Sequence, residues 1–151
     1  MARLAAHGLS VDRPAGWDVA IYRRSPTEGA TTHPVLHAAN FPLPKRRGDF
    51  GIGAVERMGP GNVFVVLFEY EPAAAGTPLF ADVGRPRPRP GHFHPRALQR
   101  TLPGQAGAQW FFTEAGRPFS LYVVLGSYAR RQTLVPMAER IVTGLRIEGA
   151  A

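Results

Sequence analysis

The chain of 151 residues suits one domain with one hydrophobic core, and 44% of its residues are hydrophobic. It has a formal net charge of +7 and no cysteine, which excludes disulfides, thiolate metal sites and cysteine nucleophiles. No apolar run approaches the roughly 20 residues of a membrane-spanning helix. The apolar stretch Leu4–Ala6 is also too short for a signal peptide. We therefore expect a cytoplasmic protein that does not associate with membranes.

The positive charge comes almost entirely from arginine, with Lys45 as the only lysine. A strongly basic chain often binds nucleic acid. Here the basic residues are scattered in short groups, among them Arg23-Arg24, residues 45–47, residues 85–89 and Arg130-Arg131. Scattered charge is typical of a solvated surface, and an arginine bias also arises from a GC-rich genome. A nucleic-acid partner is thus not favoured, and weak nucleic-acid binding stays an alternative.

The first half of the chain alternates apolar segments with turns. Asp12–Gly16 is rich in turn formers, and Trp17 after it is a large side chain suited to anchor a core. The segment 63–70, VFVVLFEY, is apolar on both faces, which is typical of an interior strand. We expect a short helix at 54–58 and strands at 8–11, 18–22, 35–41 and 63–70.

Residues 109–126 carry the clearest pattern in the chain, two apolar arms joined by the turn Glu114–Arg117. Such a pattern predicts a β-hairpin with strands at 109–113 and 119–125. In the second arm, Phe119, Leu121, Val123 and Leu125 recur at period two and share one face of the sheet. The other face carries Ser120, Tyr122 and Val124, which indicates partial cover on that side as well.

The C-terminal residues predict a helix followed by a short strand. Leu134, Met137, Ile141, Val142 and Leu145 recur at helical spacing over residues 132–145, and Leu145–Ile147 follows as the closing strand. Together these elements predict a single α+β domain over residues 1–151, with a twisted antiparallel sheet and helices packed on it. The expected core comprises Trp17, Phe64, Val66, Phe68, Trp110, Phe112, Leu121, Val123 and Ile141.

The two ends of the chain, GLSVDRPAGWDVAI and MAERIVTGLRIE, resemble the ends of PsbP/Mog1-like domains. The resemblance covers some 30 residues and implies an α/β unit with an antiparallel sheet covered by helices. Members of that family bind diverse partners, from photosystem subunits to small GTPases. The resemblance therefore implies a fold and not a particular function.

Residues 72–104 form a loop rich in proline and arginine, and its proline density forbids a continuous helix or an interior strand. Its most distinctive part is Arg85-Pro-Arg87-Pro-Arg89-Pro, which favours polyproline II conformation. One interpretation is a stiff cover over a sheet edge. The other is a docking segment for an acidic or aromatic-lined partner, with Arg85, Arg87, Arg89, His92 and His94 as the binding residues. In both cases we expect these side chains mostly in solvent, and a triple change of the arginines to serine to alter stability by less than about 1 kcal/mol.

His92 and His94 are the best metal candidates, because residues i and i+2 of an extended segment point the same way. A stable site needs further ligands, which His33 and His37 supply only if the fold brings the segments together. The spacing favours ordinary loop histidines. We expect no metal and no cofactor.

Catalytic signatures are weak. Glu69 and Glu71 are two apart at a strand end, where paired carboxylates mark an exposed terminus more often than an acid–base site. Gly51-Ile52-Gly53 lacks the third glycine of a dinucleotide fingerprint. The sequence thus favours a non-enzymatic binding or protein-interaction module. The alternatives are a small enzyme with a polar pocket near the proline-rich loop, using Glu69, Glu71 or the histidines, and the weak nucleic-acid binder.

Overall fold

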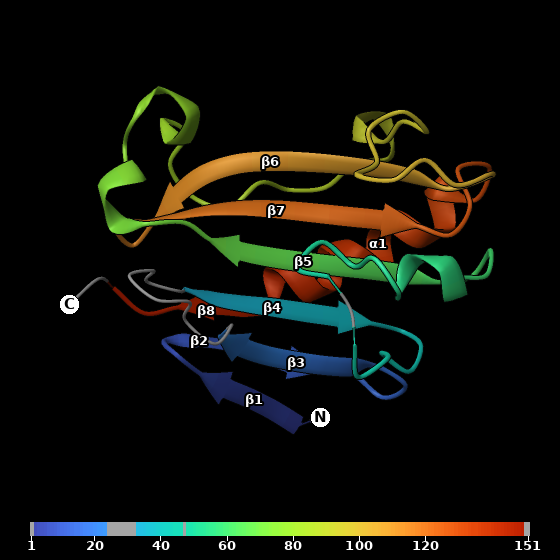
Figure 1. Ribbon diagram of the computed structural model, residues 1–151, viewed down its shortest axis with the longest axis horizontal. Helices are drawn as coiled ribbons and strands as arrows, with labels where there is room; N and C mark the ends of the chain where they lie inside the picture. Colours follow the sequence, from blue (N-terminus) through green and yellow to red (C-terminus); the bar gives the residue numbers. More distant parts are fainter. Residues whose placement is uncertain (1, 24–32, 47, 150–151) are drawn as a thin grey trace.

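The computed structural model describes residues 2–23, 33–46 and 48–149, which form two antiparallel sheets and one α-helix (Figure 1). The five-stranded sheet has the order β3-β4-β5-β7-β6, and the three-stranded sheet has the order β1-β2-β8. The larger sheet consists of β3 (Asp18–Arg23), β4 (Pro34–Ala39), β5 (Val63–Glu69), β6 (Ala106–Glu114) and β7 (Arg117–Leu125). The smaller sheet consists of β1 (Ala2–Ala6), β2 (Leu9–Arg13) and β8 (Leu145–Ile147), and the helix is α1 (Arg131–Thr143). An α+β class agrees with this content.

The expected strands are present, but the expectation of one sheet was wrong. The strands near the two ends, β2 and β8, pair with each other and not with the hairpin. The unexpected strand β1 pairs along the outer side of β2. Its alanine-rich sequence carries little β propensity, so the pairing across the tight His7-Gly8 turn determines its conformation.

The helix and the smaller sheet lie together on one face of the larger sheet (Figure 1). One continuous hydrophobic cluster joins β2, β4, β5, β6, β7 and α1, and it includes the predicted face Phe119, Leu121, Val123 and Leu125. Of the nine expected core residues, six are buried, whereas Trp17, Phe68 and Trp110 are half-buried. Among the described residues, no helix combines the length and apolarity that a membrane crossing requires.

The opposite face of the larger sheet is also covered. Tyr122 and Val124 belong to a second buried cluster with Phe64, beneath the irregular segment 41–58 and residues 98–102. The backbone N–H of Gln99 donates to the Tyr122 hydroxyl over 2.7 Å. Because both faces are covered, β5 is apolar on both sides, as predicted. The expected helix at 54–58 is a single 3-10 turn, Val55–Arg57.

The predicted hairpin turn is confirmed, since Ala115 and Gly116 have φ of 55° and 76°, as in a type I′ turn. Beyond β6, the proline-rich loop closes the edge of the sheet. Its residues 82–94, which we call the strap, pair with β6 at two bridges, Val83 with Thr113 and His94 with Gly107. The predicted cover over a sheet edge is therefore present, held by backbone hydrogen bonds at both of its ends.

We predict that Val123→Asp unfolds the protein. Val123 of β7 is fully buried in the main hydrophobic cluster, which lies between the larger sheet and α1. An unpaired charge there costs several kcal/mol against a total stability of about 5 to 15 kcal/mol. The matched control is Val83→Asp, because Val83 is 89% exposed. Thermal unfolding followed by circular dichroism is the measurement. An unchanged melting temperature for Val123→Asp would contradict the assignment of this face to the core.

A second prediction concerns alkaline pH. Burial raises the pKa of Tyr122 above its ordinary value of 10.0, although the hydrogen bond from Gln99 acts in the opposite direction. The neutral phenol is thus favoured in the folded state, so its contribution is complete below about pH 10 and is lost as pH rises through the folded pKa. In a titration of tyrosinate absorbance, one of the four tyrosines should ionise last, together with unfolding. Tyr122→Phe should remove this late step, and its persistence in that variant would refute the assignment.

Candidate functional site

Arg85, one of the predicted binding residues, is part of the fold. Its Nε and Nη2 donate to the two carboxylate oxygens of Glu114 over 3.0 and 2.5 Å. Its Nη1 donates to the backbone oxygen of Val142 over 2.8 Å and to that of Leu145. The side chain is only 24% exposed. The expectation that Arg85 lies in solvent was therefore wrong, because the strap carries it to the carbonyl groups at the end of α1, where a cation is stabilised.

Arg87 and Arg89 behave as predicted and are exposed. The Arg87 side chain is 71% exposed and its Nε forms an ion pair of 2.6 Å with Glu139 of α1. Arg89 forms no ion pair with any residue that the structure describes. The arginine–proline repeat thus combines one structural arginine with two that reach into solvent.

His92 and His94 are exposed, and each Nδ1 accepts a backbone hydrogen bond, from Arg89 over 3.1 Å and from Arg96 over 3.0 Å. His37 is fully buried on β4, with its Nε2 2.7 Å from the Asp49 backbone oxygen. Three inter-strand spacings of about 4.8 Å separate β4 from β6, so His37 cannot share an ion with the strap histidines. Among the described residues, no group of three or more metal-ligating side chains lies close enough to hold a metal.

Glu69 was expected at an exposed strand end, and this was wrong. Its carboxylate is buried and accepts two hydrogen bonds from Arg117, of 2.9 Å from Nε and 2.6 Å from Nη2. The remaining three N–H groups of Arg117 donate to the backbone oxygens of His7, Gly8 and Glu148. All five donors of this guanidinium are therefore used by the protein itself. Glu71, by contrast, is exposed.

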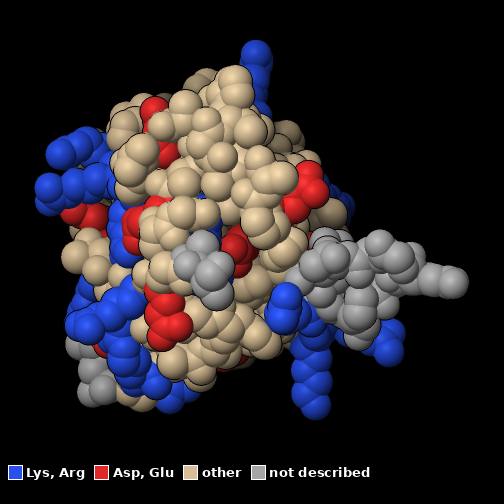
Figure 2. Space-filling view, turned by 90° about the vertical axis from the view of Figure 1, so that its left-hand side faces the viewer, with Lys and Arg blue, Asp and Glu red and all other residues tan. Residues whose placement is uncertain are grey.

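A hollow of about 500 Å³ lies beside this ion pair and reaches Pro72, the first residue of the proline-rich loop. It matches the position of the polar pocket that the enzyme alternative requires, and His7, His33 and Glu148 also border it. Because Arg117 donates to both oxygens of Glu69, that carboxylate is engaged within the fold. Figure 2 looks onto this end of the molecule, where acidic side chains lie centrally and basic ones gather on the α1 side.

A longer depression follows the outer surface of α1, and we call it the α1 groove. It consists of three adjoining hollows of about 570, 430 and 630 Å³. The first two share Glu139 and Thr143, and the last two share Pro14 and Arg140. The groove thus runs from the strap at Arg85–Pro88, across the middle of α1, to the β2–β3 turn at Arg13–Trp17.

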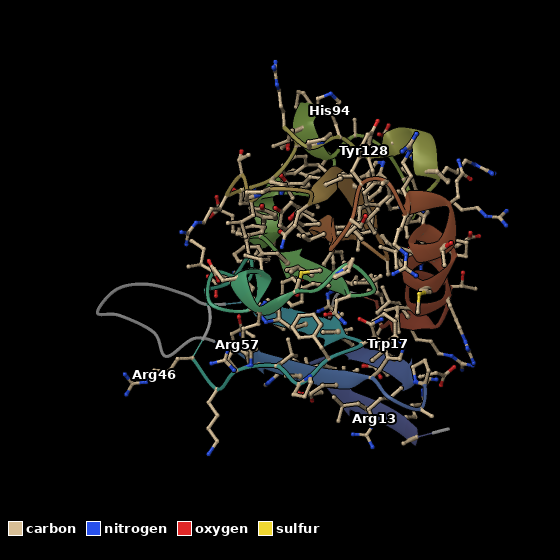
Figure 3. All side chains as sticks on the ribbon, turned by 90° about the vertical axis from the view of Figure 1, so that its right-hand side faces the viewer. Arg13, Trp17, Arg46, Arg57, His94 and Tyr128 are labelled. Carbon is tan, nitrogen blue, oxygen red and sulfur yellow. The ribbon has the colours of Figure 1, made fainter. Side chains whose placement is uncertain are left out.

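The electrostatics of the α1 groove are unbalanced. Its two acidic residues are already paired, Asp12 with Arg3 and Glu139 with Arg87. Arg13 and Arg140 are exposed and have no acidic partner among the described residues. Figure 3 shows Trp17 at the foot of α1 with Arg13 below it. The sequence pattern pointed to Trp17 only as a core anchor, and no spacing signal linked Arg13 to Arg140, since the fold alone brings β2 to α1.

The contrast between Arg85 and Arg89 yields a prediction. Arg85→Ser should destabilise the protein by about 2 to 3 kcal/mol, because it removes charge-assisted hydrogen bonds and leaves the Glu114 carboxylate unpaired and only 20% exposed. Arg89→Ser, four residues further along the same repeat, should change stability by less than about 0.5 kcal/mol. Urea unfolding at pH 7 measures both. Equal effects of the two variants would show that Arg85 does not hold the strap.

Comparisons of this chain with protein-family models, with curated proteins and with solved structures found no match. The resemblance of its two ends to PsbP/Mog1-like domains therefore stays a prediction. The described residues combine two antiparallel sheets, one α-helix, a strap over a sheet edge and a cationic groove beside the helix.

Proposed function

We propose that the protein is a cytoplasmic, non-enzymatic protein-interaction module that docks an acidic partner along the strap and the α1 groove. The observation that carries the proposal is the set of exposed arginines on this face without an acidic partner among the described residues, Arg13, Arg89 and Arg140, beside acidic residues that are already paired. An acidic partner supplies the charge that this face lacks.

The strap is well suited to recognition because it is held before any partner arrives. Its two ends are hydrogen-bonded to β6, and Arg85, near its first residue, donates to the Val142 backbone oxygen of α1. Prolines between the arginines restrict the backbone further. A segment already ordered loses little conformational entropy on binding, so Arg87, Arg89, His92 and His94 are presented at low entropic cost.

The two alternatives have less support. A nucleic acid would also meet the cations, but the basic residues are scattered in short groups along the chain, whereas a phosphate backbone favours a continuous basic stripe. For an enzyme, Glu69 is engaged by Arg117 and His37 is buried against the Asp49 backbone oxygen, so only Glu71 of the two noted carboxylates is exposed. The absence of cysteine fits a reducing compartment.

The test is binding of a labelled ten-residue peptide of glutamate and aspartate, followed by fluorescence anisotropy at low and at physiological salt. The wild-type protein should bind it, and the double variant Arg87→Ser/Arg89→Ser should bind about tenfold or more weakly, with the larger loss at low salt. The matched control is Arg46→Ser/Arg57→Ser, which removes the same charge from the far side of the molecule (Figure 3).

Equal weakening by the two double variants would mean that only net charge matters, and the docking face would be wrong. A single-stranded oligonucleotide of equal charge is the competing probe. If it binds more tightly than the peptide and responds to the same variants, the nucleic-acid alternative replaces our proposal.

A further inference from the structure

We infer that the α1 groove holds an extended acidic segment of the partner, anchored by an aromatic side chain that lies against Trp17 between Arg13 and Arg140. The inference rests on the proposed function and goes beyond it, because it assigns an anchoring hollow, at Trp17, whose lining includes none of the residues noted as binding from the sequence. It concerns the end of the groove that lies farthest from the strap.

The hollow at Trp17 combines an apolar lining with cationic borders. Its lining consists of Ala2, Pro14, Ala15, Gly16 and Trp17 together with Arg13 and Arg140. Trp17 packs partly against the main hydrophobic cluster, and its backbone N–H donates to Pro14 over 3.2 Å. Trp17 is thereby held against the core while part of the residue stays exposed. Apart from its two chain neighbours, no residue has an atom within 4 Å of the position that a Cβ on Gly16 would occupy, so there is open space beside this turn.

This lining indicates the chemistry of the occupant. A fixed, half-exposed indole favours a flat aromatic ring in offset or edge-to-face contact. Two guanidinium groups beside that ring favour carboxylates in the residues next to it. An aromatic residue flanked by glutamate or aspartate meets both conditions. An uninterrupted acidic run leaves the apolar surface uncovered, and a neutral aromatic segment leaves both cations unpaired.

The dimensions of the groove favour an extended segment. Three adjoining hollows separate Arg87 from Trp17, and an extended chain advances about 3.3 Å per residue, so a segment of several residues is needed to occupy all of them. Pro86 and Pro88 lack N–H groups, so the strap cannot take the segment as an added strand. Recognition therefore depends on side chains.

The test uses two eight-residue peptides with acidic residues at both ends. One carries phenylalanine at the second position, between acidic residues, and the other carries alanine there. The protein is the Trp110→Phe variant, in which Trp17 is the only remaining tryptophan. Binding of the phenylalanine peptide should change Trp17 fluorescence and be about tenfold tighter than binding of the alanine peptide. Adding Arg13→Ser and Arg140→Ser should weaken it about tenfold, whereas adding Arg46→Ser and Arg57→Ser should have a smaller effect.

The outcomes separate this inference from the proposed function. If both peptides bind with equal affinity, or if the Arg13/Arg140 change is no worse than the Arg46/Arg57 change while Arg87→Ser/Arg89→Ser still weakens binding, the proposed function stands and the Trp17 anchor is refuted. If neither peptide binds at low salt, the proposed function fails and the inference fails with it. A thermal melt of each variant shows whether it is folded, and binding is compared only among folded variants.

Discussion

The arrangement of the whole structure depends on two arginine–glutamate pairs. Each pair uses one residue of the hairpin turn between β6 and β7. Glu114 and Arg117 face each other across the hairpin as register partners, yet their side chains do not pair with each other. Glu114 binds Arg85 of the strap, and Arg117 binds Glu69 of β5. Each guanidinium also donates hydrogen bonds to backbone oxygens of the C-terminal region, Arg85 to Leu145 and Arg117 to Glu148. One tight turn thus ties the strap, the helix end and the smaller sheet to the larger sheet.

The hydrogen bonds of Arg117 require the backbone at Gly8 to lie close to its guanidinium group. A Cβ on Gly8 would lie 2.8 Å from Nη1 of Arg117, and Gly8 has φ of 76°, so a glycine is required there for both space and backbone conformation. Buried ion pairs of this kind stabilise little beyond their desolvation cost, but losing one partner is strongly destabilising. The contacts of Arg117 join β5 of the larger sheet to the His7-Gly8 turn and to Glu148 after β8 of the smaller sheet.

The same pairs determine which charged groups remain for function. The two pairs engage four charged side chains within the fold, those of Arg85, Glu114, Arg117 and Glu69. The net charge calculated from composition does not distinguish these side chains from the unpaired ones. Among the cations left over, Arg13 and Arg140 lie on elements far apart in the sequence and meet only because β2 and α1 are neighbours in space. The cationic groove is therefore a consequence of the packing and cannot be read from any short motif.

Local patterns in the sequence were enough to predict most of the strands, the hairpin with its turn, the C-terminal helix and the loop over a sheet edge. The reason is that period-two alternation, helical spacing and proline density act over a few residues. The separation into two sheets, the strand β1 and the roles of Arg85 and Glu69 were decided only by tertiary structure. Each depends on a partner far along the chain, and a single sequence carries no signal for a contact between residues such as Arg117 and His7.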